Sequence, residues 1–357
     1  MKKLWIALLA MMLLIMMSAG AMAAAYTLGN LTVSTQDGAC TISNWILITQ
    51  PGTYTLTSNG TASTGVVVNR PQGDVTLILD GVQIDATQNN RQTHALSIYN
   101  ENYKTTILLR GSNSLTSWDM IAGLTVVKDS KVEIRCADHD LTEHTCGSLT
   151  AVGGEYGAGI GGVMGSDTGG IEMISGTIVA DGGKYAAGIG GGGDNSGVNG
   201  GDAKDIVISG GHVKAEGDIG RYSNTGGIGA GHGGRATGIV INGSDRMSIA
   251  VRVSETGFDS MTEIAGSPFT TREDVTELVR NYPYFEAIGT PKQEEPPTQE
   301  PEGNKPDDQT HGTGDTQAAI DAASLPKTGD SSSLALWCAL LAMAGGFLWM
   351  MRRRRYS

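Results

Sequence analysis

The sequence predicts an all-β protein whose main domain is a right-handed, single-stranded parallel β-helix, a solenoid of short stacked strands. Apolar residues recur at a spacing of two, which is the spacing of a strand with one buried face. Glycine is concentrated: of the 52 glycines in the 357-residue chain, 32 lie between residues 153 and 243. Glycine disfavours helix interiors, and the stretch has no strict three-residue period with proline, which excludes a collagen helix.

The third observation is an internal repeat. An apolar pair at a spacing of two is followed by Gly-x-apolar-x-Ala-x-Gly, and a second pattern with Gly-Ile-Gly interleaves with it. Copies of the two patterns lie at 147–153, 171–182 and 206–217, and at 158–162, 187–191 and 226–229. A unit of about 30 residues cannot bury its apolar face alone, so successive units must stack, with glycine at the turns. We therefore assign residues 26–255 to the β-helix.

Both ends of a solenoid need a cover. Residues 26–56, with Trp45 and Tyr54, are expected to close the N-terminal end. Residues 256–290 gather aromatic side chains after the last repeat, and we interpret them as a C-terminal cap. Within this cap, Thr271 followed by Glu273 and an apolar pattern to Leu278 predicts a short helix.

The N-terminus reads as a secretory signal peptide over residues 1–23. Two lysines precede an apolar run from Leu4 to Met17, and Ala21-Met22-Ala23 offers a cleavage site with small flanking residues. The apolar run is short for a bilayer span, which disfavours a membrane anchor.

The C-terminus carries a second processing signal, predicted over residues 325–357. An apolar stretch from 334 to 351 follows a pentapeptide, and four arginines follow the stretch. The pentapeptide consists of Leu325, Pro326, Lys327, Thr328 and Gly329. Pentapeptide, span and basic tail together resemble the LPxTG sorting signal of Gram-positive surface proteins. A simple C-terminal membrane anchor is the alternative.

The resemblance to a sorting signal implies a sequence of events. The precursor would span the membrane transiently while a sortase cysteine attacks the carbonyl of Thr328, and an amine of the peptidoglycan precursor would resolve the acyl-enzyme. The protein would then be secreted and covalently anchored to the cell wall at Thr328, as the substrate of the sortase.

A linker is predicted over residues 291–324. It holds five prolines and an excess of acids with no apolar periodicity, which is typical of a disordered, extended stalk. The chain as a whole carries a net charge of −12, which argues against nucleic acid as a partner.

The glycine-rich repeats carry a further resemblance. The motifs Gly-Ala-Gly-Ile-Gly-Gly and Ile-x-Ile-x-Gly-Gly-x-Val-x-Ala resemble the β-helical carbohydrate-binding domains of Firmicutes surface proteins, which are similar in fold to pectate lyases. The resemblance covers roughly residues 50–250. It implies a β-helix that binds a polysaccharide. We expect the protein to be a monomer.

Three tyrosines are candidate glycan-binding residues. Tyr156, Tyr185 and Tyr222 each follow a charged residue and precede a Gly-Ile-Gly turn, so successive coils would place them in a column. Exposed rings can stack on the apolar faces of sugars. A purely structural aromatic stack is the alternative.

Four aspartates are candidate calcium ligands: Asp167, Asp194, Asp202 and Asp205. Carboxylates in turns, together with backbone carbonyls, suit Ca²⁺, which could bridge an acidic polysaccharide. The nine-residue Gly-Asp repeat of calcium-binding solenoids is absent. Solvated acids at turns are the alternative.

Two cysteines flank an insertion in the repeat. Cys136 and Cys146 stand at its mouth, and in a secreted chain this arrangement predicts a disulfide. The alternative is a metal site with His139 and His144, although the spacing is not that of a standard zinc finger. Cys40 is left over.

No nucleophile triad or glycosidase pair can be argued from spacing, so we expect no catalytic residues and no enzyme. Two other functions stay open: an adhesin or structural protein that contacts a protein partner, and a polysaccharide lyase. A lyase would need a basic residue to take a proton from the sugar, with Arg221, Arg235, Lys214 and His212 as candidates.

Overall fold

The structure is a computed structural model that describes residues 23–88, 93–138, 146–219 and 225–292. The chain divides into two units, Met1–Pro296 and Pro297–Ser357, and every described residue belongs to the first. The predicted sorting signal, nearly all of the signal peptide and the linker beyond residue 292 lie outside the described residues. Within the described ranges, no helix has the length and apolar character needed to cross a membrane.

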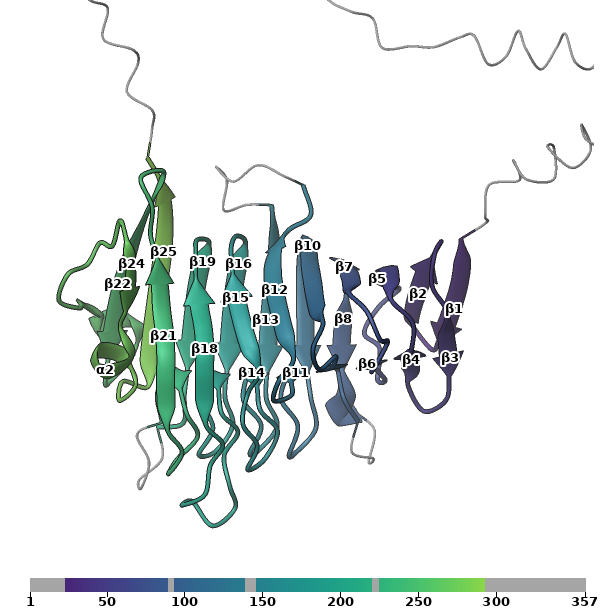
Figure 1. Ribbon diagram of the computed structural model, residues 1–357. Helices are drawn as coiled ribbons and strands as arrows, with labels where there is room; N and C mark the ends of the chain where they lie inside the picture. The colour runs from purple at the N-terminus through teal and green to yellow at the C-terminus, as the bar shows by residue number, and fades with distance from the viewer. Residues whose placement is uncertain (1–22, 89–92, 139–145, 220–224, 293–357) are drawn as a thin grey trace, which may run out of the picture. The chain divides into compact units, whose positions relative to one another are not determined.

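The first unit is all-β, and most of its strands are parallel (Figure 1). They form three stacks in which each strand pairs with its counterpart from the next repeat. Stack 1 consists of β5 (Gly52–Ser58), β7 (Val75–Asp80), the first half of β10 (Lys104–Thr116), β12 (Lys131–Cys136), β15 (Gly170–Met173), β18 (Ala203–Ile208) and β21 (Ala236–Asn242). Stack 2 consists of β4 (Ile46–Ile48), β6 (Val66–Asn69), β9 (Leu96–Tyr99), β11 (Leu124–Val126), β14 (Ile160–Gly161), β17 (Ile189–Gly190) and β20 (Ile228–Gly229). Stack 3 consists of β8 (Gln83–Asp85), the second half of β10, β13 (Gly147–Val152), β16 (Thr177–Asp181) and β19 (His212–Glu216).

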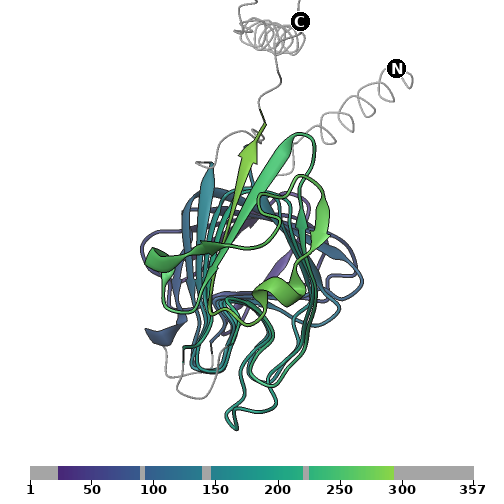
Figure 2. The same cartoon turned by 90° about the vertical axis from the view of Figure 1, so that its left-hand side faces the viewer.

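The core lies between the stacks, which surround a common interior (Figure 2). Alternate residues of each strand point inward, so the register of stack 1 produces an unbroken column of buried side chains. Each member of this column is fully buried: Tyr54, Leu77, Ile107, Ile134, Met173, Ile208 and Ile241. Each such side chain contributes about 1.5–3 kcal/mol by leaving water.

Glycine is required where neighbouring repeats approach each other most closely. A Cβ atom on Gly188 would lie 2.6 Å from the backbone nitrogen of Glu216. On Gly190, which has φ +140°, it would lie 1.7 Å from the carbonyl oxygen of Gly229. No side chain fits at either distance, so the Gly-Ile-Gly pattern keeps the strands of stack 2 within hydrogen-bonding reach of one another.

The N-terminal border of the parallel region consists of antiparallel strands. β1 (Ala24–Leu28) pairs with β2 (Leu31–Thr35), β2 pairs with β5, and β3 (Cys40–Ile42) pairs with β4. The buried Tyr54 ties this border together. Its hydroxyl group donates to the carbonyl of Gln50 at 2.9 Å and accepts the Ala39 N–H at 3.2 Å.

The C-terminal border is antiparallel as well. β25 (Tyr284–Pro291) lies between β19 and β22 (Met247–Ser254), and β24 (Arg272–Asp274) pairs with β21. β23 (Thr262–Glu263) completes the border. The described residues also form three short helical elements: η1 (Ala86–Gln88) among the repeats, and η2 (Phe258–Ser260) and α2 (Thr276–Val279) after β22.

The described C-terminal border differs from the sequence prediction in three details. The antiparallel strands begin with β22, which the sequence assigned to the repeats. The helix expected from Thr271 is only the four-residue α2, because 272–274 form a strand. β25 ends at Pro291, the first residue of the predicted linker, since its pairing with Met247 continues to that proline.

Replacing Gly190 by alanine should destabilise the protein by about 2–4 kcal/mol, because the added methyl group collides with the next strand and the backbone is left strained. Gly170→Ala is the matched control. Its Cβ would have no neighbour closer than 3.7 Å and its φ is not positive, so its free energy of unfolding should stay within about 0.5 kcal/mol of the parent. Chemical denaturation of both variants tests this, and equal stabilities would contradict it.

Candidate functional site

A half-buried aromatic column runs along one side of the repeats. Tyr156 follows β13 and Tyr185 follows β16, so the two occupy equivalent turns. Their rings stack with centroids 6.5 Å apart and planes inclined by 25°. The ring of His232 continues the column, 5.9 Å from Tyr185 and inclined by 38°. We call Tyr156, Tyr185 and His232 the aromatic column.

One lysine makes cation–π contacts with both tyrosines. The exposed Lys184 holds its ammonium 5.7 Å from the centre of the Tyr156 ring and 5.1 Å from that of Tyr185. Partial desolvation and a hydrogen bond with Glu155 raise the pKa of Tyr156, so its phenol is neutral at physiological pH. The column thus offers two stacked rings beside one positive charge.

Backbone contacts hold the column in register. The Tyr185 N–H donates to Asp218 Oδ2 at 2.9 Å, and its carbonyl accepts the His232 N–H at 2.8 Å. These bonds keep Tyr185 at φ +62°, a left-handed conformation that costs a tyrosine about 1–2 kcal/mol. Gly197 has its Cα above the Tyr185 ring, where a Cβ would lie 3.2 Å from the ring carbons.

The third predicted tyrosine lies outside the described residues. Tyr156 and Tyr185 precede the isoleucines of stack 2, Ile160 and Ile189, by four residues, whereas Tyr222 precedes Ile228 by six. The ring that the structure places on Tyr185 is that of His232, which follows Ile228. From the sequence, His232 is interpreted as a surface residue of a Gly-rich turn, because nothing in the repeat pattern pairs it with the tyrosines.

The four candidate calcium ligands do not gather at one point. Among the residues that the structure describes, no group of three or more His, Cys, Asp or Glu side chains is arranged to hold a metal ion. Asp167 pairs with Lys128 at 2.9 Å and accepts the Asp202 N–H at 2.9 Å. The hydrogen bond from Lys128 and the one from Asp202 hold the pKa of Asp167 below its ordinary value.

The other three aspartates have local roles. Asp202 repeats the contact of Asp167 one repeat later by accepting the Arg235 N–H at 2.7 Å. Asp194 accepts the N–H and hydroxyl of Ser196 within a turn. Asp205 adopts φ +58° beside Gly238 at an irregularity in the pairing of β18 with β21. Asp167 and Asp202 therefore link successive repeats.

Cys136 and Cys146 form a disulfide, with Cα atoms 5.7 Å apart, across the predicted insertion. His139 and His144, the other residues of the alternative metal site, lie outside the described residues. Cys40 is a buried free thiol, and burial raises its pKa to about 11.

A cluster of charges, unrecognised from the sequence, fixes the last strand. Glu286 on β25 is 4% exposed. It contacts three basic side chains: His212 Nε2 at 2.8 Å, Lys214 Nζ at 3.6 Å and the Arg252 guanidinium. Burial acts to raise the pKa of Glu286, but the His212 hydrogen bond and the charges of Arg252 and Lys214 outweigh it and lower this pKa overall. The cluster joins β25 to its neighbours β19 and β22.

Two carboxylates stand side by side in stack 3. Asp181 on β16 and Glu216 on β19 are register partners. Burial and the charge of Asp181 raise the pKa of Glu216, while a hydrogen bond with Tyr284 opposes this shift. Burial raises the pKa of Asp181 as well. The repeat patterns give no signal for this pair, because outward-facing residues vary freely between repeats.

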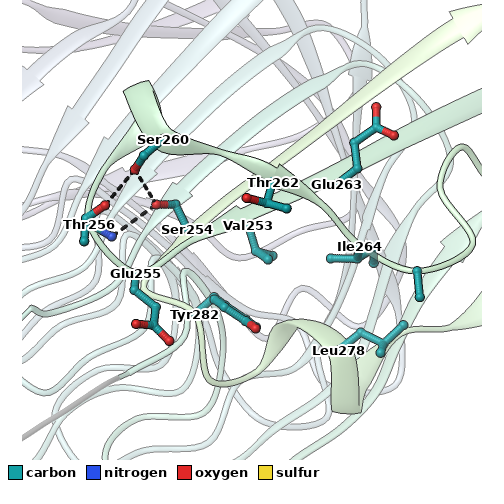
Figure 3. Close-up of a pocket in the computed structure, with 11 residues that line it drawn as sticks. Val253, Ser254, Glu255, Thr256, Ser260, Thr262, Glu263, Ile264, Leu278 and Tyr282 are labelled. Carbon is teal, nitrogen blue, oxygen red and sulfur yellow. Dashed lines mark hydrogen bonds between the residues drawn. The ribbon is translucent and has the colours of Figure 1, made fainter.

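Two of the hollows on the described surface exceed 500 Å³. One, of about 650 Å³, lies on the outer side of stack 1, where lysines and acids alternate and Lys104 pairs with Glu133 at 2.9 Å. The other, of about 520 Å³, lies in the C-terminal border between β22, β23 and α2 (Figure 3).

Comparison of the chain with protein-family models, with curated proteins and with solved structures gives no match.

Glu286→Gln should cost about 1–3 kcal/mol of stability at pH 7, because Arg252 and Lys214 lose their charged partner. A lowered pKa in the folded state means that this stabilisation is present above the pKa of the unfolded chain and is lost as pH falls through the folded value. The difference between parent and variant should therefore shrink as pH falls from 7 through the acid range. Denaturation at several pH values tests this, and a pH-independent difference would contradict it.

The thiol of Cys40 should resist modification in the native protein at pH 8, because burial blocks access and a pKa of about 11 leaves almost no thiolate. The fourth cysteine, Cys338, lies in the C-terminal apolar stretch and is replaced by serine for this test. We expect no reaction of the Cys338→Ser variant with a thiol reagent until denaturant is added, and then one equivalent. Rapid labelling of the folded protein would contradict the burial of this side chain.

Proposed function

We propose that this protein is a cell-wall-anchored surface protein whose repeat domain binds a polysaccharide along the aromatic column. The stacked pair Tyr156–Tyr185, flanked by Lys184 and His232, is the observation that carries the proposal. The column does not line up enough acid, base or nucleophile groups for a defined reaction, so binding is the activity it supports.

The proposal includes the fold of the repeat domain. We take the three stacks as the faces of a right-handed parallel β-helix, with the antiparallel borders as its caps. The parallel pairing of each strand with its counterpart in the next repeat supports this. In such a coil, equivalent turns recur at about 4.8 Å, the strand spacing.

Chemistry favours an acidic glycan. Both tyrosines are half-buried, and the exposed parts of their rings present apolar surface to the C–H groups of a sugar. Lys184 lies beside both and can pair with a uronate carboxylate, so calcium bridging is not needed for charge recognition. Side chains in equivalent turns of successive repeats would meet successive parts of an extended chain.

Display outside the cell completes the proposal. The signal peptide would direct secretion, the sortase would join Thr328 to peptidoglycan, and the acidic linker would carry the monomeric repeat domain away from the wall. The sequence motifs support these steps, and the disulfide between Cys136 and Cys146 agrees with an oxidising, extracellular setting.

Replacing both Tyr156 and Tyr185 by alanine should weaken glycan binding at least about tenfold, because two stacking surfaces are lost. The double phenylalanine variant keeps both rings and should bind like the parent. Glycan arrays with and without Ca²⁺ would identify the ligand, and titration calorimetry would give the affinities.

The controls separate the other functions. Tyr103→Ala removes an exposed ring outside the column and should leave binding unchanged. Formation of an unsaturated product, seen by ultraviolet absorbance, would replace the proposal by a lyase. If no glycan on the array binds and the protein retains a host protein instead, its function is that of an adhesin.

A further inference from the structure

The hollow in the C-terminal border has the features of a second ligand site. It shares no residue with the aromatic column, and its volume of about 520 Å³ exceeds that of one sugar ring. Its walls come from the end of β22, the segment from η2 through β23, and α2 (Figure 3). It is therefore a concave site assembled from separate elements.

The floor of this hollow is apolar. Val253 and Ile264 are buried, and Leu278 from α2 is 39% exposed although it is a large apolar side chain. The ring of Tyr282 lies beside them, and in Figure 3 the four side chains line the middle of the hollow. A flat apolar patch with one aromatic ring suits the C–H face of a pyranose.

A group of hydroxyls forms part of the rim. Ser260 Oγ lies 2.8 Å from Ser254 Oγ and 2.7 Å from Thr256 Oγ1, so these three groups form a hydrogen-bonded chain. Thr262 and the phenol of Tyr282 also line the hollow. Hydroxyl groups act as donors and acceptors and can extend such a chain to the hydroxyls of a ligand.

The charge of the rim is negative. Glu255 and Glu263 line the hollow, stand on opposite sides of the apolar floor in Figure 3, and both are exposed. The lining includes no lysine, arginine or histidine. An anionic sugar, or the acidic segment that follows Lys292, would be repelled, whereas a cation would be attracted.

We propose that this hollow binds a single hydroxyl-rich sugar ring that carries a protonated amine, that is, an unacetylated hexosamine unit. The apolar floor and Tyr282 would receive one face of the ring, the serine and threonine hydroxyls would contact its hydroxyls, and Glu255 and Glu263 would favour its ammonium. The proposal is independent of the aromatic column, whose lysine selects the opposite charge.

The test uses the full-length chain with methyl glucosaminide as the probe, observed by saturation-transfer NMR and by titration. Glu255→Gln/Glu263→Gln keeps shape and removes two charges, so binding should weaken about fivefold or more. Asp245→Asn/Glu273→Gln removes the same charge from exposed residues of the border that do not line the hollow, and it should bind like the parent. Leu278→Arg places bulk and positive charge on the floor and should abolish binding, with unfolding curves confirming that the variant is folded.

Two comparisons sharpen the result. Binding should weaken when 0.5 M NaCl replaces 0.05 M NaCl, and methyl N-acetylglucosaminide and methyl galacturonide should bind more weakly than the amine. The proposal is overturned if the parent does not bind methyl glucosaminide, if both double variants bind equally, or if a lysine peptide competes as well as the sugar, which would indicate a peptide site. Loss of glycan binding at Tyr156 and Tyr185 leaves these outcomes unchanged.

Discussion

The close approach of successive repeats is the constraint on which the rest of this structure depends. Backbone hydrogen bonds between strands of stack 2 form only because Gly188 and Gly190 have no side chain at a point where the next strand lies within van der Waals contact. These short strands contribute few bonds each. Their stability comes from repetition, since every repeat buries the apolar face of its neighbour and a defect in one repeat exposes two.

The same constraint fixes the spacing of side chains on the surface. Once the backbones of two repeats are in register, side chains in equivalent turns are held about 4.8 Å apart without contacts of their own. Tyr156 and Tyr185 stack for this reason, and Asp167 and Asp202 each reach the backbone of the following repeat. Functional groups thus gain fixed spacing from the core, while the outward residues stay free to vary.

Repetition also decided what could be predicted from the sequence. Ile171 and Ile206 were expected at equivalent positions, and they are register partners. The Tyr156–Tyr185 neighbourhood followed from the same counting. Contacts outside the repeats could not be predicted in this way. Glu286 contacts His212, 74 residues earlier in the chain, because β25 pairs antiparallel with β19, and the repeat pattern gives no sign of this pairing. His232 and the Asp181–Glu216 pair were missed because a column forms from any turns that come together, whether or not their sequences are alike.

The reversed strands at both ends have a consequence for assembly. A stack of parallel strands that simply stopped would offer a free row of N–H and C=O groups, on which another molecule could continue the stack without limit. Here short antiparallel strands cover these rows instead, with β2 and then β1 on β5 at one end and β25 and then β22 on β19 at the other. The parallel pairing of one molecule is thus covered at its ends, and a second molecule finds no bare row of stack 1 or stack 3 on which to continue it.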